Sequence, residues 1–267
     1  MKEVILTNGK LTIKESGEYL FKAESDTETL IEYLSDQPLK VDLKVEVGKA
    51  SHTTLVFLNH TTNSLETKEE FRIAGYAQFG YLELSGHPAK HHIRSYLTSE
   101  GAYSDIHTAS VADNNLDYDI ETIHEKPHTT GLMENYGIVV KQVPWTIVCA
   151  GRINKYSVGA QSKQTTRILT FVQPELIKVL PILYIDEDDV IASHATSLGQ
   201  PDADELYYME SRGLNRDQAI GLLTIGYLMP IAKFPYDKSY QKLISHEIFK
   251  KVTSWKIEVN SGKSFRC

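Results

Sequence analysis

Cysteine is scarce in this sequence, which has 267 residues and two cysteines, Cys149 and the terminal Cys267. Two isolated cysteines provide neither a disulfide framework nor the paired spacing of a zinc site. No apolar run approaches the ~20 residues that a membrane span requires. The N-terminal residues also turn polar too soon to form the core of a signal peptide. We therefore expect a cytoplasmic protein in a reducing compartment, with no membrane partner.

Positive charge is also scarce. The formal net charge is -7, and no segment is rich in lysine and arginine. A chain with this charge has no long-range attraction for nucleic acid, so we expect no nucleic-acid partner. Hydrophobic residues make up 41% of the chain, which is enough to bury one large core or two modest ones.

Strand-like runs fill the chain from about residue 10 to residue 197, and no helical period long enough for a crossover helix lies between them. The absence of crossover helices excludes a doubly wound α/β sheet. The runs recur about every 8 to 12 residues, as in a sandwich, a barrel or a solenoid. The runs are KLTIK, KVDLKVEV, TTLVFL, EFRIAG, GYLELSG, HIRSYL, YDIETI, GIVVKQV, WTIVCAG, RILTFV, LIKVLPILYI and VIASHA.

Hairpin signals are rare among these runs, with NG at Asn8–Gly9 and SG at Ser85–Gly86 the obvious dipeptides. Several runs are almost continuously apolar, where a sandwich strand would alternate. Parallel strands cannot use two-residue hairpins and are buried on both faces, so both features favour a solenoid. We predict a mainly β protein in which residues 1–200 form a parallel β-helix.

Residues 201–267 follow a helical pattern, and we predict a C-terminal helical domain there. Asp202 places a carboxylate at the start of a first helix, and Gly213 stands where a C-terminal glycine is expected. Asn215 and Gln218 have the spacing of a capping box for a second helix. A third helix is predicted for residues 238–255. The second helix is apolar on most sides, and the sequence leaves open whether it is buried in its own domain or shared with a partner subunit.

Few residues have the spacing of a catalytic or metal site. His194 ends a strand, where it is either a hydrogen-bonded structural residue or a metal ligand. Cys149 lies in an apolar run, which favours a buried small side chain over a redox or sulfur-carrying thiol. His91 and His92 are adjacent, so they point to opposite faces of a strand, and a proline separates His124 from His128. The acidic run at residues 186–189 is interpreted as a solvated turn, and no metal site is predicted.

Four motifs between residues 160 and 230 carry a resemblance to a known family. They are the arginine of QTTR, the strand P-x-L-x-I-x-x-D-D-V, the Ser193–His194 pair that follows, and the turn Y-x-x-S-R-G-L before an apolar helix. Upstream, His124 and Thr129 match an H-x-x-x-x-T rung. The sequence resembles the SufB/SufD family of iron–sulfur cluster assembly proteins, and SufD most closely. It is shorter than a full-length SufD, and we expect the difference to fall at the N-terminal helical region.

This resemblance implies a right-handed parallel β-helix followed by a helical domain. It also implies a SufD-like scaffold that pairs with a SufB-like or identical subunit, docks a SufC-type ATPase and works with a cysteine desulfurase system. A transient iron–sulfur cluster would form at the subunit interface, next to His194. By the SufB spacing, the SufB cysteine corresponds to Thr166 and the SufB glutamate to Ala195, so both SufB groups are replaced here.

The region that resembles the ATPase-docking segment contains Tyr207, Tyr208, Arg212 and Gly213. We expect a non-enzymatic scaffold. Two alternatives remain open from the sequence: a stand-alone homodimer that holds or delivers iron or a cluster, and a carbohydrate-active enzyme built on a β-helix. The enzyme would require clustered carboxylates or a catalytic histidine along one groove, and the sequence has no constellation with distinctive spacing.

Overall fold

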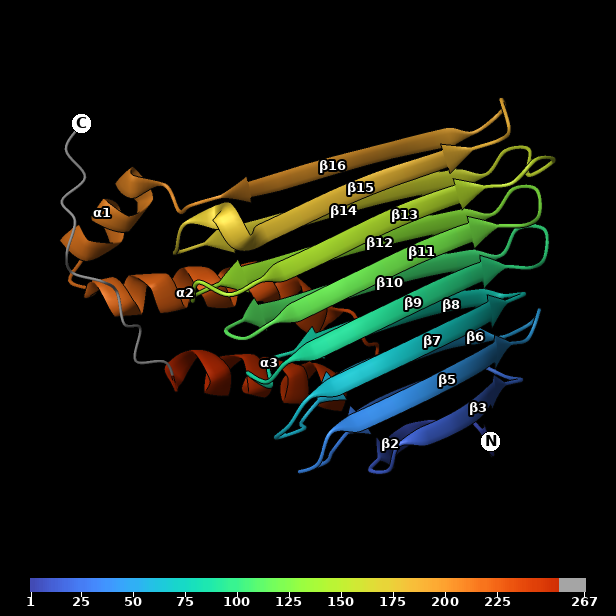
Figure 1. The fold of residues 1–267 in the computed structure, drawn as a ribbon, viewed down its shortest axis with the longest axis horizontal. Helices are drawn as coiled ribbons and strands as arrows, with labels where there is room; N and C mark the ends of the chain where they lie inside the picture. The colour runs from blue at the N-terminus through green and yellow to red at the C-terminus, as the bar shows by residue number, and fades with distance from the viewer. Residues whose placement is uncertain (255–267) are drawn as a thin grey trace.

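The computed structural model describes residues 1–254, in which consecutive strands alternate between two parallel β-sheets (Figure 1). The first sheet has the order β1 (Lys2–Ile5), β3 (Gly17–Ala23), β5 (Leu39–Val47), β7 (Leu65–Ile73), β9 (Ala89–Leu97), β11 (Leu116–His124), β13 (Trp145–Ile153) and β15 (Ile177–Ile185). The second has the order β2 (Gly9–Ile13), β4 (Thr27–Tyr33), β6 (His52–Asn59), β8 (Tyr76–Glu83), β10 (Tyr103–Ala112), β12 (Thr130–Val139), β14 (Gln161–Thr170) and β16 (Ile191–Gly199). The prediction of a mainly β, parallel solenoid is confirmed.

The two sheets bury their outer faces differently. In the first sheet, β5 (LKVDLKVEV) alternates strictly between buried and exposed residues, because its outer face meets solvent. In the second sheet, β6 (HTTLVFLN) is buried at every residue after His52. The almost continuous apolar runs noted in the sequence therefore belong to strands with a covered outer face.

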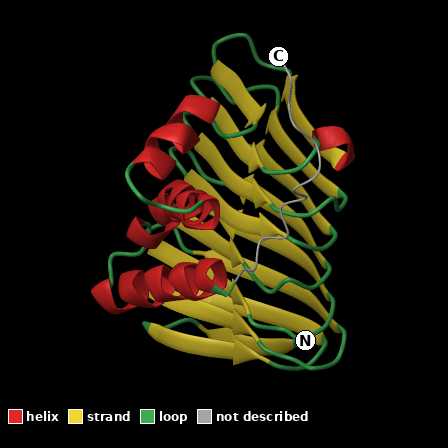
Figure 2. Ribbon diagram, turned by 90° about the vertical axis from the view of Figure 1, so that its left-hand side faces the viewer, coloured by secondary structure: helices red, strands yellow, loops and turns green. Residues whose placement is uncertain are grey.

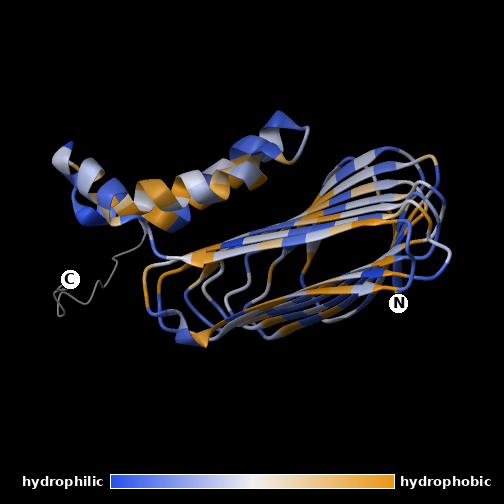
Figure 3. Ribbon diagram, turned by 90° about the horizontal axis from the view of Figure 1, so that it is seen from above, coloured by the Kyte–Doolittle hydropathy of each residue, from blue (hydrophilic) through white to orange (hydrophobic). Residues whose placement is uncertain are grey.

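Helices provide that cover (Figures 2 and 3). Leu228, Ile231, Ile244 and Ile248 from the helical segment form one hydrophobic cluster with residues on the outer face of the second sheet. Their partners in the sheet are Leu30, Val56, Leu58, Leu82, Ala109, Val111 and Ile138. Burying such side chains contributes about 1.5–3 kcal/mol each, so this contact holds the helices to the solenoid.

The helices begin at the predicted caps. Asp202 accepts a hydrogen bond from the backbone N–H of Asp204 at the start of α1 (Ala203–Ser211). Asn215 and Gln218 form the predicted capping box at the start of α2 (Arg216–Leu228). A 3-10 turn, η2 (Met229–Lys233), then leads to α3 (Lys238–Thr253). A further 3-10 turn, η1 (Pro174–Leu176), precedes β15.

Three boundaries differ from the sequence expectation. Strands start at Lys2 rather than near residue 10, and β16 extends to Gly199. The third helix is described as far as Thr253, and Trp255 and Cys267 lie outside the described residues. Among residues 1–254, no helix is long and apolar enough to cross a membrane.

Candidate functional site at the open end of the solenoid

The solenoid is open at the end formed by β15 and β16, at the top of Figure 1. Each of these strands has one neighbour, β13 or β14, among the described residues, so one edge of each carries free backbone N–H and C=O groups. Large apolar side chains are also exposed on the two strands: Leu180, Tyr184, Ile185, Ile191 and Leu198, each between 39% and 56% exposed. Both features are typical of a surface that another chain covers.

His194 lies in β16, in register with Gln164 of β14, which is in turn in register with Met133 of β12. Gln164 and Met133 are inward-facing and 2% and 1% exposed. His194 therefore continues an interior column of the second sheet, and it is exposed because, within residues 1–254, no further coil lies above it. Among the described residues, its side chain makes no hydrogen bond or ion pair, so the imidazole is free to bind a ligand.

The two positions that the family resemblance predicts to replace the SufB groups have different surroundings. Thr166 is 2% exposed, and its hydroxyl accepts a hydrogen bond of 3.2 Å from the side-chain amide of Asn135. Ala195 is exposed next to His194. Neither residue offers a thiolate or a carboxylate, so His194 has no second ligand from these positions.

Cys149 lies in β13 of the first sheet and faces Thr166 across the interior. Its Sγ atom is 3.8 Å from the Thr166 hydroxyl and accepts a hydrogen bond of 3.2 Å from Asn135. Burial raises the pKa of the thiol to about 12, and the hydrogen bonds from Thr166 and Asn135 do not offset it. The thiol is therefore protonated at neutral pH and is a poor iron ligand. No local sequence pattern indicates the Cys149–Thr166 contact, because it depends on how the two sheets face each other.

Several buried polar atoms near this end have no hydrogen-bond partner within the described part of the chain. The indole nitrogen of Trp145 is one of them, and we call four of the other residues the C-terminal polar set: Thr122, His124, Ser162 and Gln164. Burial lowers the pKa of His124 to about 4, so its ring is neutral. Its Nδ1 atom is 2.8 Å from the Thr129 hydroxyl, and this contact explains the H-x-x-x-x-T spacing as a structural bond within one coil.

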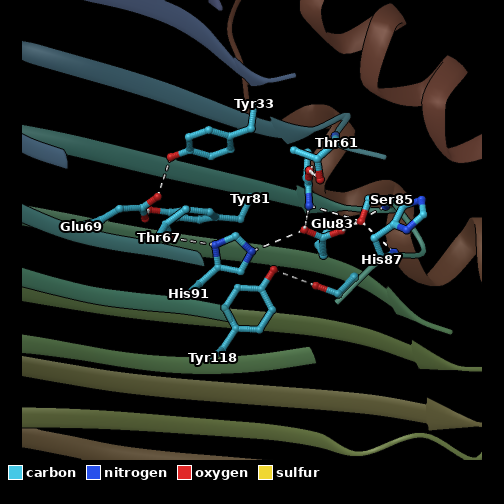
Figure 4. Close-up of polar contacts among 12 residues, drawn as sticks. Tyr33, Thr61, Thr67, Glu69, Tyr81, Glu83, Ser85, His87, His91 and Tyr118 are labelled. Atoms are coloured by element: carbon cyan, nitrogen blue, oxygen red, sulfur yellow. Dashed lines mark hydrogen bonds and ion pairs between the residues drawn. The ribbon is translucent and has the colours of Figure 1, made fainter. Parts of the chain in front are cut away.

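A second group of interior polar residues is fully hydrogen-bonded (Figure 4). Glu69 accepts hydrogen bonds from the Tyr33 hydroxyl at 2.7 Å and the Tyr81 hydroxyl at 2.5 Å. His91 lies 3.0 Å from Thr67 and 3.4 Å from Glu83. We call this group the sealed network: Tyr33, Asn59, Thr67, Glu69, Tyr81, Glu83 and His91. No sequence motif indicated this network, although Thr67 and Glu69 occupy inward positions between Leu65 and Phe71 in the alternating strand LETKEEFRI.

In the sealed network, burial and hydrogen bonding have opposing effects on the pKa values of Glu69 and Glu83. Burial raises the pKa of Glu69, and the charge of His91 and the bonds from Tyr81 and Tyr33 only partly offset it. Burial also acts to raise the pKa of Glu83, but His91, Ser85 and Asn59 outweigh it and leave the pKa below its usual value. His92, by contrast, points outward and pairs with Asp119 at 2.9 Å.

The acidic run at residues 186–189 forms an exposed loop between β15 and β16. Glu187 accepts a hydrogen bond from the backbone N–H of Tyr156, and the backbone carbonyl of Asp189 accepts one from Gly159. Within residues 1–254, no group of three or more histidine, cysteine or acidic side chains has the geometry of a metal site.

The predicted docking residues lie on α1. Tyr207 and Tyr208 are 72% and 58% exposed, and the Arg212 guanidinium lies 5.2 Å from the centre of the Tyr208 ring. Gly213 has a φ of +95°, which ends the helix in the left-handed region that favours glycine. On its other side, α1 packs through Leu206 against Ala219 and Ile220 of α2.

Residues 20–227 match the family model described as the SufBD core domain of the SUF system for iron–sulfur cluster assembly. The chain belongs to the SufBD family. The match includes β15, β16, α1 and almost all of α2. The open end and the exposed face of α1 therefore lie within the SufBD core region.

Curated SufBD relatives are considerably longer than this chain. It is 30% identical over 152 residues to the iron–sulfur cluster assembly protein SufD of Bacillus subtilis, an alignment that covers 56% of this chain and 35% of the relative. It is 24% identical over 140 residues to an iron–sulfur cluster assembly SufBD family protein of Mycobacterium tuberculosis, with 52% of this chain and 16% of the relative covered. The chain thus matches about a third or less of each relative.

Proposed function

We propose that this SufBD chain is a SufD-like scaffold in iron–sulfur cluster assembly, and that it pairs through β15 and β16 with a SufB-like subunit. The open end of the solenoid, with His194 at its centre, is the observation that carries this proposal. A second copy of the chain is the alternative partner, and it would give a stand-alone homodimer that holds or delivers iron or a cluster.

Pairing at this end is supported by two complementary driving forces. The free edges of β15 and β16 supply backbone hydrogen-bond groups for strands of another chain. The exposed Leu180, Ile185 and Leu198 would lose their contact with water, which favours association through the hydrophobic effect.

Charged variants of the edge test the pairing. Leu198→Asp places a charge on β16 and should abolish the assembly with the SufB-like subunit, as measured by size-exclusion chromatography with light scattering. Leu34→Asp is the matched control, because Leu34 is also 39% exposed but lies at a turn outside β15 and β16. Assembly that survives Leu198→Asp would contradict the proposed surface. A dimer formed without any partner would favour the homodimer alternative.

The ligands at the interface are divided between chains in this proposal. His194 would supply one neutral imidazole or one hydrogen bond to the nascent cluster, which is the cargo of the complex. The thiolate ligands would come from the partner, since within residues 1–254 the one cysteine, Cys149, is buried and protonated and Thr166 carries no thiol.

His194→Ala tests this role. We expect the variant to assemble normally with its partner but to form less cluster, as measured by the visible absorption of the reconstituted complex. Ser193→Ala is the control, because Ser193 is the exposed neighbour on the opposite face of the same strand. Normal cluster formation by His194→Ala would show that the imidazole is not a ligand.

The exposed face of α1 is proposed to dock a SufC-type ATPase. Tyr207 and Tyr208 are the large aromatic residues that anchor many interfaces, and Arg212 is placed beside them. The double variant Tyr207→Ser/Tyr208→Ser should weaken binding of the ATPase in a pull-down assay. Tyr156→Ser is a control with similar exposure, 73%, in a loop of the solenoid. Equal binding by both variants would contradict the proposed docking site.

A further inference from the structure

The helices cover the outer face of the second sheet (Figures 2 and 3), and two histidines lie in the seam between these layers. His60 follows β6 directly and contacts Glu247 of α3. His107 lies in β10, and its ring lies against Phe234, the residue that follows η2, with ring centres 4.8 Å apart. Each histidine therefore joins the solenoid to the helical segment.

His60 lies between two carboxylates from different layers. Its Nδ1 atom is 2.7 Å from Glu32 of β4, and its Nε2 atom is 3.5 Å from Glu247 of α3. A neutral imidazole has one N–H group and can donate to one of these carboxylates, whereas a protonated ring donates to both. Within residues 1–254, Glu247 has no other ion-pair partner, while Glu32 also pairs with Lys10 at 2.9 Å. The contact with α3 is therefore complete only when His60 is protonated.

His107 also lies between two carboxylates. Its Nε2 atom is 2.9 Å from Asp105, and its Nδ1 atom is 4.0 Å from Glu134 of β12. Asp105 is 7% exposed, and His107 is its one ion-pair partner among the described residues. A protonated imidazole would compensate the charge of this buried carboxylate, and an aromatic ring such as that of Phe234 attracts a cation. Protonation therefore strengthens the contacts of His107 on both sides of the seam.

The other titratable groups beside these contacts keep one charge state near neutral pH. Burial acts to raise the pKa of Glu32, but Lys10 and His60 outweigh it and leave the pKa below its usual value. Burial raises the pKa of Tyr103 and Tyr136, so both phenols are uncharged. Histidine, by contrast, is the side chain that ordinarily changes charge in this range.

Two further contacts fasten α3 without a histidine. Lys251 pairs with Asp113 at 2.8 Å, and the backbone N–H of Asp237 donates to the Glu28 carboxylate at 2.9 Å. Burial raises the pKa of Glu28, so this carboxyl group also favours the attached state below its raised pKa and less above it. A test of the histidines must therefore separate two contributions of the same sign.

We propose that His60 and His107 form a pH-dependent link between the η2–α3 segment and the second sheet, which we call the histidine link. Histidine ordinarily changes charge between about pH 5 and 8. At the acid end of this range the protonated rings attract the carboxylates of both layers, and this attraction is lost as the pH rises and the rings become neutral. The Lys251–Asp113 pair stays, so rising pH loosens the helical segment without releasing it.

Amide hydrogen exchange of the full chain at pH 6 and pH 8, corrected for the intrinsic effect of pH on exchange, tests the histidine link. We expect α3 to be about two- to tenfold more protected at pH 6. The double variant His60→Gln/His107→Gln keeps side-chain N–H donors that cannot gain a charge, so it should lose most of this difference. Equal protection of α3 at both pH values in the wild type, or an undiminished difference in the double variant, would overturn the proposal.

Two control variants show whether the effect belongs to these histidines. His92→Gln removes a histidine that pairs with Asp119 at 2.9 Å on the outer face of the first sheet, away from the helices, and should leave the difference unchanged. Glu28→Gln removes the other titratable contact of α3 and should keep most of the difference. A complete loss in either control would contradict the assignment to His60 and His107.

Glu247→Gln separates the histidine link from a general change in stability. At pH 6, this variant and His60→Gln should each lower the protection of α3, and the combined variant should lose less than the product of the two single losses, because both remove one shared contact. At pH 8 this coupling should disappear. Single losses that simply multiply at pH 6 would show that His60 and Glu247 do not interact.

Discussion

The interior of the solenoid contains two polar regions that differ in how they are satisfied. In the sealed network, Glu69, Glu83 and His91 are 2–3% exposed, and each has a partner across the interior on the facing sheet. In the C-terminal polar set, Ser162 and Thr122 are equally buried, but their hydroxyl groups have no partner in the described part of the chain. The buried polar groups of the solenoid are therefore hydrogen-bonded in one region and partly without partners in the other.

The sealed network is structural in character. The carboxyl groups of Glu69 and Glu83 lie in the middle coils of the solenoid, with further coils on both sides. The Tyr81 hydroxyl and the His91 ring form hydrogen bonds with these carboxyl groups. The C-terminal polar set lies closer to the open end, with Gln164 directly beneath His194. Buried polar groups with unused hydrogen-bonding capacity are costly, so the C-terminal polar set contributes less to the stability of the fold than the sealed network does.

The largest effect is expected for Glu69→Ala. This change leaves the Tyr33 and Tyr81 hydroxyls without a partner and creates a cavity, so the free energy of unfolding should fall by about 3–5 kcal/mol. Urea unfolding followed by circular dichroism measures it. Glu69→Gln keeps an acceptor oxygen and should cost clearly less. If both variants lose the same stability, the hydrogen bonds to Glu69 are unimportant.

Glu83→Gln should cost about 1–3 kcal/mol at pH 7, because the charged partner of His91 is lost. The pKa of Glu83 lies below the usual value of 4.5, so its contribution is present above pH 4.5 and is lost as the pH falls through the pKa of the folded state. The difference in stability between the wild type and the variant should therefore shrink in acid. Urea unfolding at pH 7, 5 and 4 checks this, and a difference that grows in acid would reverse the assigned sign.

Gln164→Leu tests the C-terminal polar set. Its side-chain oxygen has no partner among the described residues, and its amide makes one bond of 2.9 Å to the Ile182 carbonyl. Replacing it with an apolar side chain of similar size should change the free energy of unfolding by no more than about 1 kcal/mol. A loss as large as that of Glu69→Ala would show that the two regions are energetically alike.

The smallest effect on stability is expected for His194→Ala. The imidazole is exposed and makes no hydrogen bond within residues 1–254, so the thermal midpoint of the isolated chain should stay within about 1–2 °C of the wild type. Differential scanning calorimetry of the chain without its partner measures it. A larger fall would assign His194 a structural role in β16.

Much of the fold could be predicted from local patterns. Alternating runs such as KVDLKVEV, the scarcity of hairpin dipeptides and the capping box at Asn215 each follow from geometry within a few residues. Less of the candidate site could be predicted. The family motifs drew attention to His194 and to the Y-x-x-S-R-G-L turn, but neither Glu69 nor Glu83 has any distinctive spacing in the sequence.

The sequence by itself determined the strand period and the helix starts, because these depend on residue type and near neighbours. Only the tertiary structure decided which sheet the helices cover, that Cys149 faces Thr166, and that Glu28 meets the start of α3. Each of these depends on the register between coils and on the packing of segments up to about 200 residues apart, and no local propensity encodes such contacts.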